Sequence, residues 1–358
     1  MSSPFLVNLA CLMPQPTGIS TYVLHLFPQL RSLHPTLLTA QAIEGYTCYS
    51  IPGGMTAAQG TQGHLKRLLW TQGQLPSIYN RLQAKLLFSP VPEAPLWSGC
   101  RSIVMVHDLI PLRFPRRFSP LTLYTRSIVP RILNRVEHIV VNSEATARDI
   151  VDFFSVPAQR ITPIPLAYDA SHFRWLNLPT QNYFLYLGRL DPYKNVQRLI
   201  AAFAQLGHRY SDYQLYLAGP PDQRYLPLLQ KCMVELQVTE RVKFLHYVPY
   251  AELPRLLNQA IALVFPTLWE GFGLPALEAM ACGTPVITSN LASLPEVTGG
   301  AALLIDPYKV QEIATAMEQI IIDRRLWSDL RSAGLKQATQ FSWVKTGQTT
   351  ASLLQHYL

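Results

Sequence analysis

Short apolar runs alternate with longer amphipathic stretches through the second half of the sequence. The apolar runs lie at 183–187, 214–218, 242–245, 261–265, 285–288 and 302–305. The stretches between them have apolar residues at helical spacing, at 195–206, 223–236, 251–258, 275–282 and 310–321. Strands that alternate with helices in this way predict parallel βαβ units, with helices on both faces of a sheet.

The first half shows the same alternation less clearly. Strands are predicted at 5–9, 86–88, 102–106, 138–141 and 160–164, and helices from a loop at 16–18 to about residue 33 and at 121–136. The stretch 53–73 is rich in glycine and glutamine and predicts a loop with one short helix, and 167–179 predicts a linker. We therefore expect an α/β protein of two Rossmann-like, doubly wound domains facing a central cleft.

The predicted domains are residues 1–170 and 171–343, followed by a last helix at 344–358 for which packing on the first domain is one arrangement. The chain has 358 residues, of which 49% are hydrophobic and 15% charged, and this balance supports two cores and excludes a disordered chain. No apolar run approaches the roughly 20 residues of a membrane span, and no basic cluster opens the chain. We expect a cytoplasmic protein, with peripheral contact at the inner membrane face left open.

The sequence predicts no metal site. Its five cysteines are scattered without C-x-x-C spacing, which also argues against a disulfide framework, and its nine histidines form no H-E-x-x-H motif. No D-x-D motif for a divalent cation is present either.

The net charge of +8 includes six arginines in the stretch 113–135. Such a basic stretch can attract nucleic acid, anionic lipid or phosphorylated substrates, or can simply be a solvated helix face. No nucleic-acid recognition motif with interleaved aromatics accompanies it, so we expect no nucleic-acid partner. Apolar residues at near-helical spacing indicate either a helix lying on an anionic membrane or an ordinary helix with its apolar face in the core: Leu123, Tyr124, Ile128, Ile132 and Leu133.

The segment from Glu270 to Glu278 carries the clearest chemical signal. It reads Glu-Gly-Phe-Gly-Leu-Pro-Ala-Leu-Glu, with Pro275 where a helix should begin and Gly283 where it should end. Glycines let a ligand approach the backbone, and free N–H groups at a helix start receive phosphate or sugar hydroxyls. We expect Glu270 on the loop and Glu278 on the first helical turn, where a glutamate also stabilises any helix.

The same segment satisfies G-x-G-x-x-A, the pattern of dinucleotide-binding turns, through Gly271, Gly273 and Ala276. That pattern normally occupies a first βα turn and is followed by an acidic residue at the end of the next strand. Here it comes after several βα units, and the next strand ends in Thr288, Ser289 and Asn290. A dehydrogenase is therefore disfavoured.

A second signal follows the predicted strand at 183–187, where Gly188 is succeeded by Arg189 and Lys194. Two fixed cations at the carboxyl end of a strand can meet the charge that develops on a departing diphosphate. Arginine binds phosphate bidentately and lysine acts as a point charge.

These two segments, with residues 293–297 and 299–306, resemble the C-terminal domain of the family 4 (group 1) retaining glycosyltransferases of the GT-B fold, in particular bacterial mannosyltransferases of polysaccharide synthesis. Glu270 and Glu278 match that family's pair of glutamates separated by seven residues. The resemblance implies that Arg189 and Lys194, beside Gly188, hold the donor diphosphate and that Glu278 hydrogen-bonds the nucleotide ribose. It also implies that Glu270 and the backbone of Phe272, Gly273 and Leu274 grip the transferred sugar. Gly271 belongs to the same donor-binding group.

The first half resembles the same family more loosely. Residues 16–22 are similar to its glycine loop after the first strand, although only Gly18 stands where many relatives have two or more glycines. Residues 104–115 are similar to a strand-to-loop histidine segment of bacterial members, many of which use GDP-mannose, and 139–148 are similar to the strand and helix that follow. The resemblance makes His107 a candidate for contact with the sugar or the acceptor, and the alternative is a histidine bonded to local backbone.

The resemblance implies a retaining, metal-independent hexosyltransferase without a cofactor beyond its nucleotide diphosphate sugar. Asp108 is the one carboxylate of the first domain that could act as a nucleophile, and a loop cap is the more ordinary role for it. Mannose from GDP-mannose is the first expectation and glucose from UDP-glucose the second, with a saccharide or lipid-linked saccharide as acceptor. A nucleotide-sugar epimerase, a glycan phosphorylase, a basic nucleic-acid-binding protein and a degenerate binding module are the alternatives.

Overall fold

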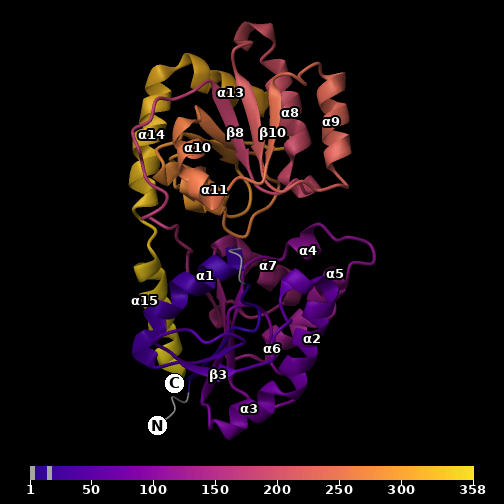
Figure 1. Ribbon diagram of the computed structural model, residues 1–358, viewed down its shortest axis with the longest axis vertical. Coiled ribbons are helices and arrows are strands. Elements are labelled where there is room, and N and C mark those ends of the chain that lie inside the picture. The colour runs from indigo at the N-terminus through magenta and orange to yellow at the C-terminus, as the bar shows by residue number, and fades with distance from the viewer. Residues whose placement is uncertain (1–4, 14–17) are drawn as a thin grey trace. The chain divides into compact units, whose positions relative to one another are not determined.

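The computed structural model describes residues 5–13 and 18–358 (Figure 1). Its contacts divide the chain into two compact units, Met1–Leu166 with Trp343–Leu358, and Ala167–Ser342. Each unit contains one sheet in which all described strand pairs are parallel. Both are therefore Rossmann-like α/β units, as the alternation of strands and helices predicts.

The sheet of the first unit has the strand order β3-β2-β1-β4-β5-β6-β7. Its strands are β1 (Phe5–Asn8), β2 (Thr36–Thr39), β3 (Thr47–Ser50), β4 (Leu86–Ser89), β5 (Ser102–Val106), β6 (His138–Val141) and β7 (Ile161–Pro163). Strands β1, β4, β5 and β6 are buried along their whole length because helices cover both faces of a parallel sheet. The chain reverses its winding direction between β1 and β4.

The helices of the first unit are α1 (Gly18–Leu26), α2 (Gly60–Gly73), α3 (Leu75–Arg81), α4 (Ile110–Arg113), α5 (Pro120–Ser127), α6 (Val129–Arg135), α7 (Glu144–Phe154) and α15 (Trp343–Tyr357). The C-terminal helix α15 returns to this unit and lies beside α1 (Figure 1). Its Trp343 ring stacks on His25 of α1, with ring centroids 5.1 Å apart.

The sheet of the second unit has the order β10-β9-β8-β11-β12-β13. Its strands are β8 (Tyr183–Leu187), β9 (Gln214–Ala218), β10 (Val242–His246), β11 (Ala262–Phe265), β12 (Val286–Ser289) and β13 (Leu303–Ile305). The helices are α8 (Val196–Gln205), α9 (Leu226–Glu235), α10 (Leu253–Gln259), α11 (Leu274–Ala281), α12 (Leu294–Thr298), α13 (Val310–Ile322) and α14 (Arg324–Ala338). In Figure 1, α8 and α9 lie on one side of this sheet, and α10, α11 and α14 lie on the other.

Two predictions for the first unit are wrong. The stretch 53–73 is not mainly loop, because 14 of its residues form α2. Gly63 packs so closely against the backbone that a Cβ there would lie 2.1 Å from the carbonyl oxygen of Thr56, so this glycine serves helix packing. The single helix predicted at 121–136 is two, α5 and α6, which separate at Ile128 just before Pro130, a residue that lacks the N–H to continue the helical ladder.

Candidate functional site

The strand order of the second unit determines where a ligand can approach its sheet. The winding direction reverses between β8 and β11, and doubly wound sheets bind ligands beyond the carboxyl ends of the strands at such a reversal. The loop after β8 carries Arg189 and Lys194, and the loop after β11 carries Glu270. Topology therefore brings together two segments that are more than 70 residues apart in sequence.

Lys194 and Glu270 form an ion pair at this position. The lysine Nζ lies 2.5 Å from Oε1 of Glu270, and the two side chains are only 12% and 10% exposed. Nζ also lies 5.2 Å from the ring centroid of Tyr193 and 5.4 Å from that of Phe265. The cation is thus held in a largely desolvated place between a carboxylate and two aromatic rings, where its charge is strongly felt.

Asn195 fixes the backbone that presents Lys194. It has a left-handed φ of 64°, which asparagine tolerates well, and α8 begins directly after it. Its amide Nδ2 donates to the carbonyl oxygens of Pro266, at 3.0 Å, and Pro307, at 2.6 Å. This buried side chain links the loops after β8, β11 and β13, a role that the sequence analysis missed.

Arg189 is the more exposed cation of the pair. Its side chain is 64% exposed, and its Nε lies 2.9 Å from Oδ2 of the buried Asp191. The Tyr186 hydroxyl donates to the Arg189 carbonyl oxygen, which fixes the backbone of the loop. The backbone of Arg189 is therefore fixed, while its guanidinium keeps N–H donors that face solvent.

Glycines follow the carboxyl ends of two neighbouring strands of this sheet, β8 and β9. Gly188, at the end of β8, has a φ of 152° and donates its N–H to Ala218 at 2.9 Å. Gly219, at the end of β9, has a φ of 155°, and a Cβ on it would lie 1.9 Å from the carbonyl oxygen of Gly188. Gly219 thus shapes the loop that holds Arg189, and it was not among the predicted site residues.

The loop 271–274 presents backbone donors beside Glu270. The N–H groups of Phe272, Gly273 and Leu274 have no acceptor within the part of the chain that the structure describes. The Phe272 side chain is buried against Phe341, so this residue can offer a ligand only its backbone. The carbonyl oxygens of Glu270 and Phe272 lie 3.0 and 2.8 Å from the Ser293 hydroxyl, which holds the loop in shape.

The start of α11 differs from the prediction by one residue. The helix begins at Leu274, so Pro275 is its second residue, and Gly273 precedes it with a φ of 101°. Glu278 is consequently its fifth residue and does not lie on the first turn, because the loop enters the helix one position earlier. Gly283 follows the helix with a φ of 71°, as expected of a terminating glycine.

Glu278 is a carboxyl group without a hydrogen-bond partner among the described residues. Burial raises its pKa from 4.5 to about 8. No cation is among the groups that shift this pKa, so desolvation of the charged form is its cause. Such a group is well suited to accept hydrogen bonds from the hydroxyls of a ligand.

In the first unit, His107 follows β5 and bonds to local backbone. Its Nε2 lies 3.0 Å from the Pro90 carbonyl oxygen, which can only accept, so this nitrogen carries the proton. Burial lowers the pKa of His107 to about 4, and the ring stands edge-on to Tyr22 at 5.0 Å. The imidazole is therefore neutral at pH 7 and keeps Nδ1 as an acceptor.

The remaining predicted residues of the first unit lie near the N-terminus and after β5. Gly18 is the exposed first residue of α1, and the rest of its predicted loop, residues 16 and 17, lies outside the described residues. Asp108 accepts the Ile110 N–H at 3.0 Å through Oδ1, which is the loop-cap arrangement considered for it.

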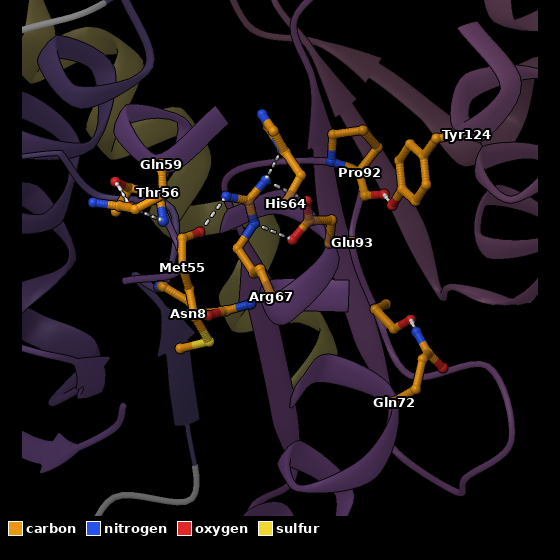
Figure 2. A network of polar contacts seen from close by, with 12 residues as sticks. Asn8, Met55, Thr56, Gln59, His64, Arg67, Gln72, Pro92, Glu93 and Tyr124 are labelled. Carbon is orange, nitrogen blue, oxygen red and sulfur yellow. Dashed lines mark hydrogen bonds and ion pairs between the residues drawn. The ribbon is translucent and has the colours of Figure 1, made fainter. Parts of the chain in front are cut away.

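The loop after β4 is held by polar contacts from several elements (Figure 2). The buried Arg67 of α2 bonds both carboxylate oxygens of Glu93 at 2.7 Å and the Met55 carbonyl oxygen at 2.6 Å. The Tyr124 hydroxyl donates to the Pro92 carbonyl oxygen at 3.0 Å. Since His107 binds the same loop at Pro90, the network gives this histidine a fixed support.

The described residues lack two features, a cluster of metal ligands and a membrane-spanning helix. They contain no group of three or more His, Cys, Asp or Glu side chains that could hold a metal ion. None of their helices is long and apolar enough to cross a membrane.

Two family models match the chain, one described as glycosyl transferases group 1 over residues 168–337 and one as glycosyltransferase family 4 over residues 16–172. The O-antigen chain mannosyltransferase B of Escherichia coli is 34% identical over an alignment of 259 residues that covers 68% of this chain and 67% of that protein. The serotype-specific mannosyltransferase WbdA of Escherichia coli is 30% identical over 69% of this chain but only 32% of its own length. The chain thus spans about a third of that second relative.

Solved structures show the same fold. The sucrose-phosphate synthase of Thermosynechococcus elongatus matches with a TM-score of 0.75 and 20% identity over 98% of each chain. HepE of Anabaena, in complex with UDP and glucose, matches with a TM-score of 0.76 and 20% identity over 99% of each chain. Both units thus have the sheets of a GT-B protein, and the chain belongs to the group 1, family 4 glycosyltransferases.

Proposed function

We propose that this chain is a retaining hexosyltransferase that takes mannose from GDP-mannose and passes it to a saccharide or lipid-linked saccharide. Glucose from UDP-glucose is the second choice of donor. The observation that carries the proposal is the placement of Lys194 and Glu270 at the reversal point of the sheet, beside the N–H groups of residues 272–274, which have no acceptor among the described residues. The choice of mannose is supported by relatives that are named mannosyltransferases.

Each part of such a donor has a chemically matched partner in the second unit. Lys194 and Arg189 supply positive charge for the diphosphate, and the N–H groups at the start of α11 add neutral donors. Glu270 accepts hydrogen bonds from the hydroxyls of the sugar. Glu278, which has no partner among the described residues, accepts those of the ribose.

The transfer needs no protein nucleophile in this proposal. The bond between the sugar C1 and the phosphate oxygen breaks, and its electron pair stays on the phosphate. The acceptor hydroxyl oxygen forms its bond to C1 on the same face and passes its proton to that phosphate. The protein orients the donor and the acceptor and places fixed positive charges beside the departing diphosphate. In this proposal it uses no metal and no cofactor.

Transfer assays test the proposal directly. The full chain is incubated with GDP-mannose, UDP-glucose, UDP-galactose or dTDP-glucose and a mannose-containing saccharide acceptor, with and without EDTA. We expect EDTA-insensitive transfer, with GDP-mannose the best donor and with product whose anomeric configuration by NMR matches that of the donor. Transfer with inversion would refute the retaining mechanism, and epimerised nucleotide sugar without transfer would indicate an epimerase.

The acceptor side includes a basic surface on α4, α5 and the segment 114–119 between them that we propose contacts the cytoplasmic face of an anionic membrane. Phe118, Leu121 and Leu123 are 90%, 53% and 66% exposed. Exposed arginines accompany them, at 113, 116, 117 and 126. The apolar residues of α6 are buried in the core instead, so of these two helices α5 is the one with apolar side chains exposed to a partner.

Co-sedimentation with vesicles tests this contact. We expect salt-sensitive binding to phosphatidylglycerol vesicles, weak binding to phosphatidylcholine, and loss of binding in Leu123→Glu/Arg126→Glu. Leu228→Glu/Lys231→Glu, at exposed positions of α9 with the same spacing and the same change in charge, is the matched control and should bind like the unchanged chain. Equal sedimentation with both lipids would exclude an electrostatic membrane surface.

A further inference from the structure

We propose that the ion pair between Lys194 and Glu270 is a latch through which the site distinguishes the nucleotide sugar from the nucleoside diphosphate left after transfer. This inference rests on the proposed function and deepens it. It assigns Glu270 a second role, that of lowering the affinity of the site for the nucleoside diphosphate left after transfer.

The pair that forms the latch is closed in the structure. Nζ of Lys194 and Oε1 of Glu270 lie 2.5 Å apart, and the side chains are 12% and 10% exposed. Removing the partner of a nearly buried charge leaves the other charge desolvated and uncompensated, which is strongly unfavourable. A phosphate that draws Lys194 away from Glu270 therefore leaves this carboxylate desolvated and without a partner. The bound state is favourable only if another group donates hydrogen bonds to Glu270.

The other cation of the site is paired in a similar way. Arg189 lies 2.9 Å from Asp191, so two cations and two carboxylates sum to no net charge at the place proposed for the diphosphate. Asp191 is buried and pairs with an exposed guanidinium that can turn its other N–H groups outward. Only the Lys194–Glu270 pair has to open when phosphate binds.

The two ligands differ in what they offer to Glu270. A nucleotide sugar carries hydroxyls that donate to the carboxylate at the moment its phosphate takes over Lys194, so both charges stay compensated. A nucleoside diphosphate brings an additional negative charge, keeps its ribose hydroxyls and lacks the hydroxyls of the transferred sugar. It leaves Glu270 unpaired beside an anion, which favours departure of the product and return of the closed pair.

Isothermal titration of GDP and GDP-mannose, with UDP and UDP-glucose as a second pair, measures this discrimination. The variants are Glu270→Gln, which keeps the shape and removes the charge, and Glu235→Gln on α9, an exposed control that removes one charge elsewhere. We expect Glu270→Gln to bind the nucleoside diphosphate about tenfold tighter or more while its affinity for the nucleotide sugar stays equal or falls. Glu235→Gln should leave both affinities unchanged.

The double variant Lys194→Ala/Glu270→Gln separates the latch from two independent contacts. Lys194→Ala alone should weaken nucleoside diphosphate binding more than the double variant does, because it leaves Glu270 uncompensated. Additive effects of the two substitutions, or equal changes for both ligands in Glu270→Gln, would overturn the latch while transfer by the unchanged chain still upheld the proposed function. If neither ligand bound the unchanged chain, the proposed function itself would fail.

Discussion

Lys194 combines three properties that a cation for a leaving group needs. It is largely buried, it is fixed by the geometry of Asn195, and it lies at the end of a loop that starts from a central strand. A lysine with the same charge on the surface, such as Lys231 of α9, has none of them, since its side chain is 74% exposed.

Lys194→Ala should therefore reduce kcat/KM for sugar transfer by tenfold to more than a hundredfold, as expected for loss of a charge-assisted contact worth about 1.5–3 kcal/mol. Lys231→Ala should retain full activity. Steady-state kinetics with each donor gives the comparison, and circular dichroism verifies the fold. Near-normal turnover by Lys194→Ala would remove this residue from the mechanism.

Glu278 predicts a pH dependence of stability. Its pKa is about 8 in the folded chain against the usual 4.5, so between these values the unfolded chain loses a proton that the folded chain retains. Stability from this group is therefore complete below about pH 4.5, falls as the pH rises, and is lost in full above about pH 8.

Thermal unfolding of Glu278→Gln at pH 5, 6.5 and 8.5 tests this dependence. The Tm of the variant relative to the unchanged chain should rise by several degrees across the series, because glutamine carries no proton to lose. Glu235→Gln, exposed on α9, should give a flat difference. Parallel Tm curves for Glu278→Gln and the unchanged chain would show that the carboxyl is ordinarily solvated.

The chemistry of the site was visible in the sequence, but the residues that shape it were not. Arg189, Lys194 and Glu270 stand out because charged groups follow apolar strands. Asn195 and Gly219 are ordinary loop residues in sequence, and only the tertiary contacts that they make reveal their roles.

At the scale of elements, α2 and the loop after β4 depend on one buried ion pair. Arg67→Ala should destabilise the chain by about 3–5 kcal/mol because it leaves Glu93 buried without its partner. Arg101→Ala breaks the exposed pair with Glu137, whose side chains are 45% and 38% exposed, and should cost about 0–1 kcal/mol. Urea unfolding followed by circular dichroism measures both, and similar losses would show that burial of the Arg67 pair is unimportant.

The close approach of the chain at the ends of β8 and β9 requires glycine at position 219. Gly219→Ala should shift the loop at Arg189 and lower both stability and donor affinity, because its Cβ would meet the Gly188 carbonyl oxygen. Gly99→Ala, where no heavy atom lies within 4 Å of the added carbon, is the control and should be neutral. Titration with donor and thermal unfolding provide the two readouts, and an unaffected Gly219→Ala would mean that the loop adapts freely.

Most strands that pack into the cores were predicted well, with the buried β2 as an exception, and elements that depend on context were not. The strands at 183–187, 214–218, 102–106 and 138–141 have the predicted bounds because they are continuous apolar runs. Strand β3 lies at the sheet edge and is partly exposed, so its residues form no such run, and it was missed together with β2. Helix α14 was missed too, because few of its residues are buried and its apolar pattern is weak.

At the scale of the whole molecule, the doubly wound fold follows from the alternation of strands and helices, and the GT-B comparison confirms it. The central cleft between the two units stays a prediction. The return of α15 to the first unit depends on contacts of Trp343 with His25 and Tyr22, which no local pattern encodes.

The central claim is that Lys194 and Arg189 receive the diphosphate of a nucleotide sugar. A crystal structure of the chain with a non-transferable GDP-mannose analogue tests it most directly. We expect phosphate oxygens within hydrogen-bond distance of Nζ of Lys194 and of the Arg189 guanidinium, with the Lys194–Glu270 pair open and a sugar hydroxyl on Glu270. A diphosphate bound elsewhere, with that pair still closed, would contradict the account.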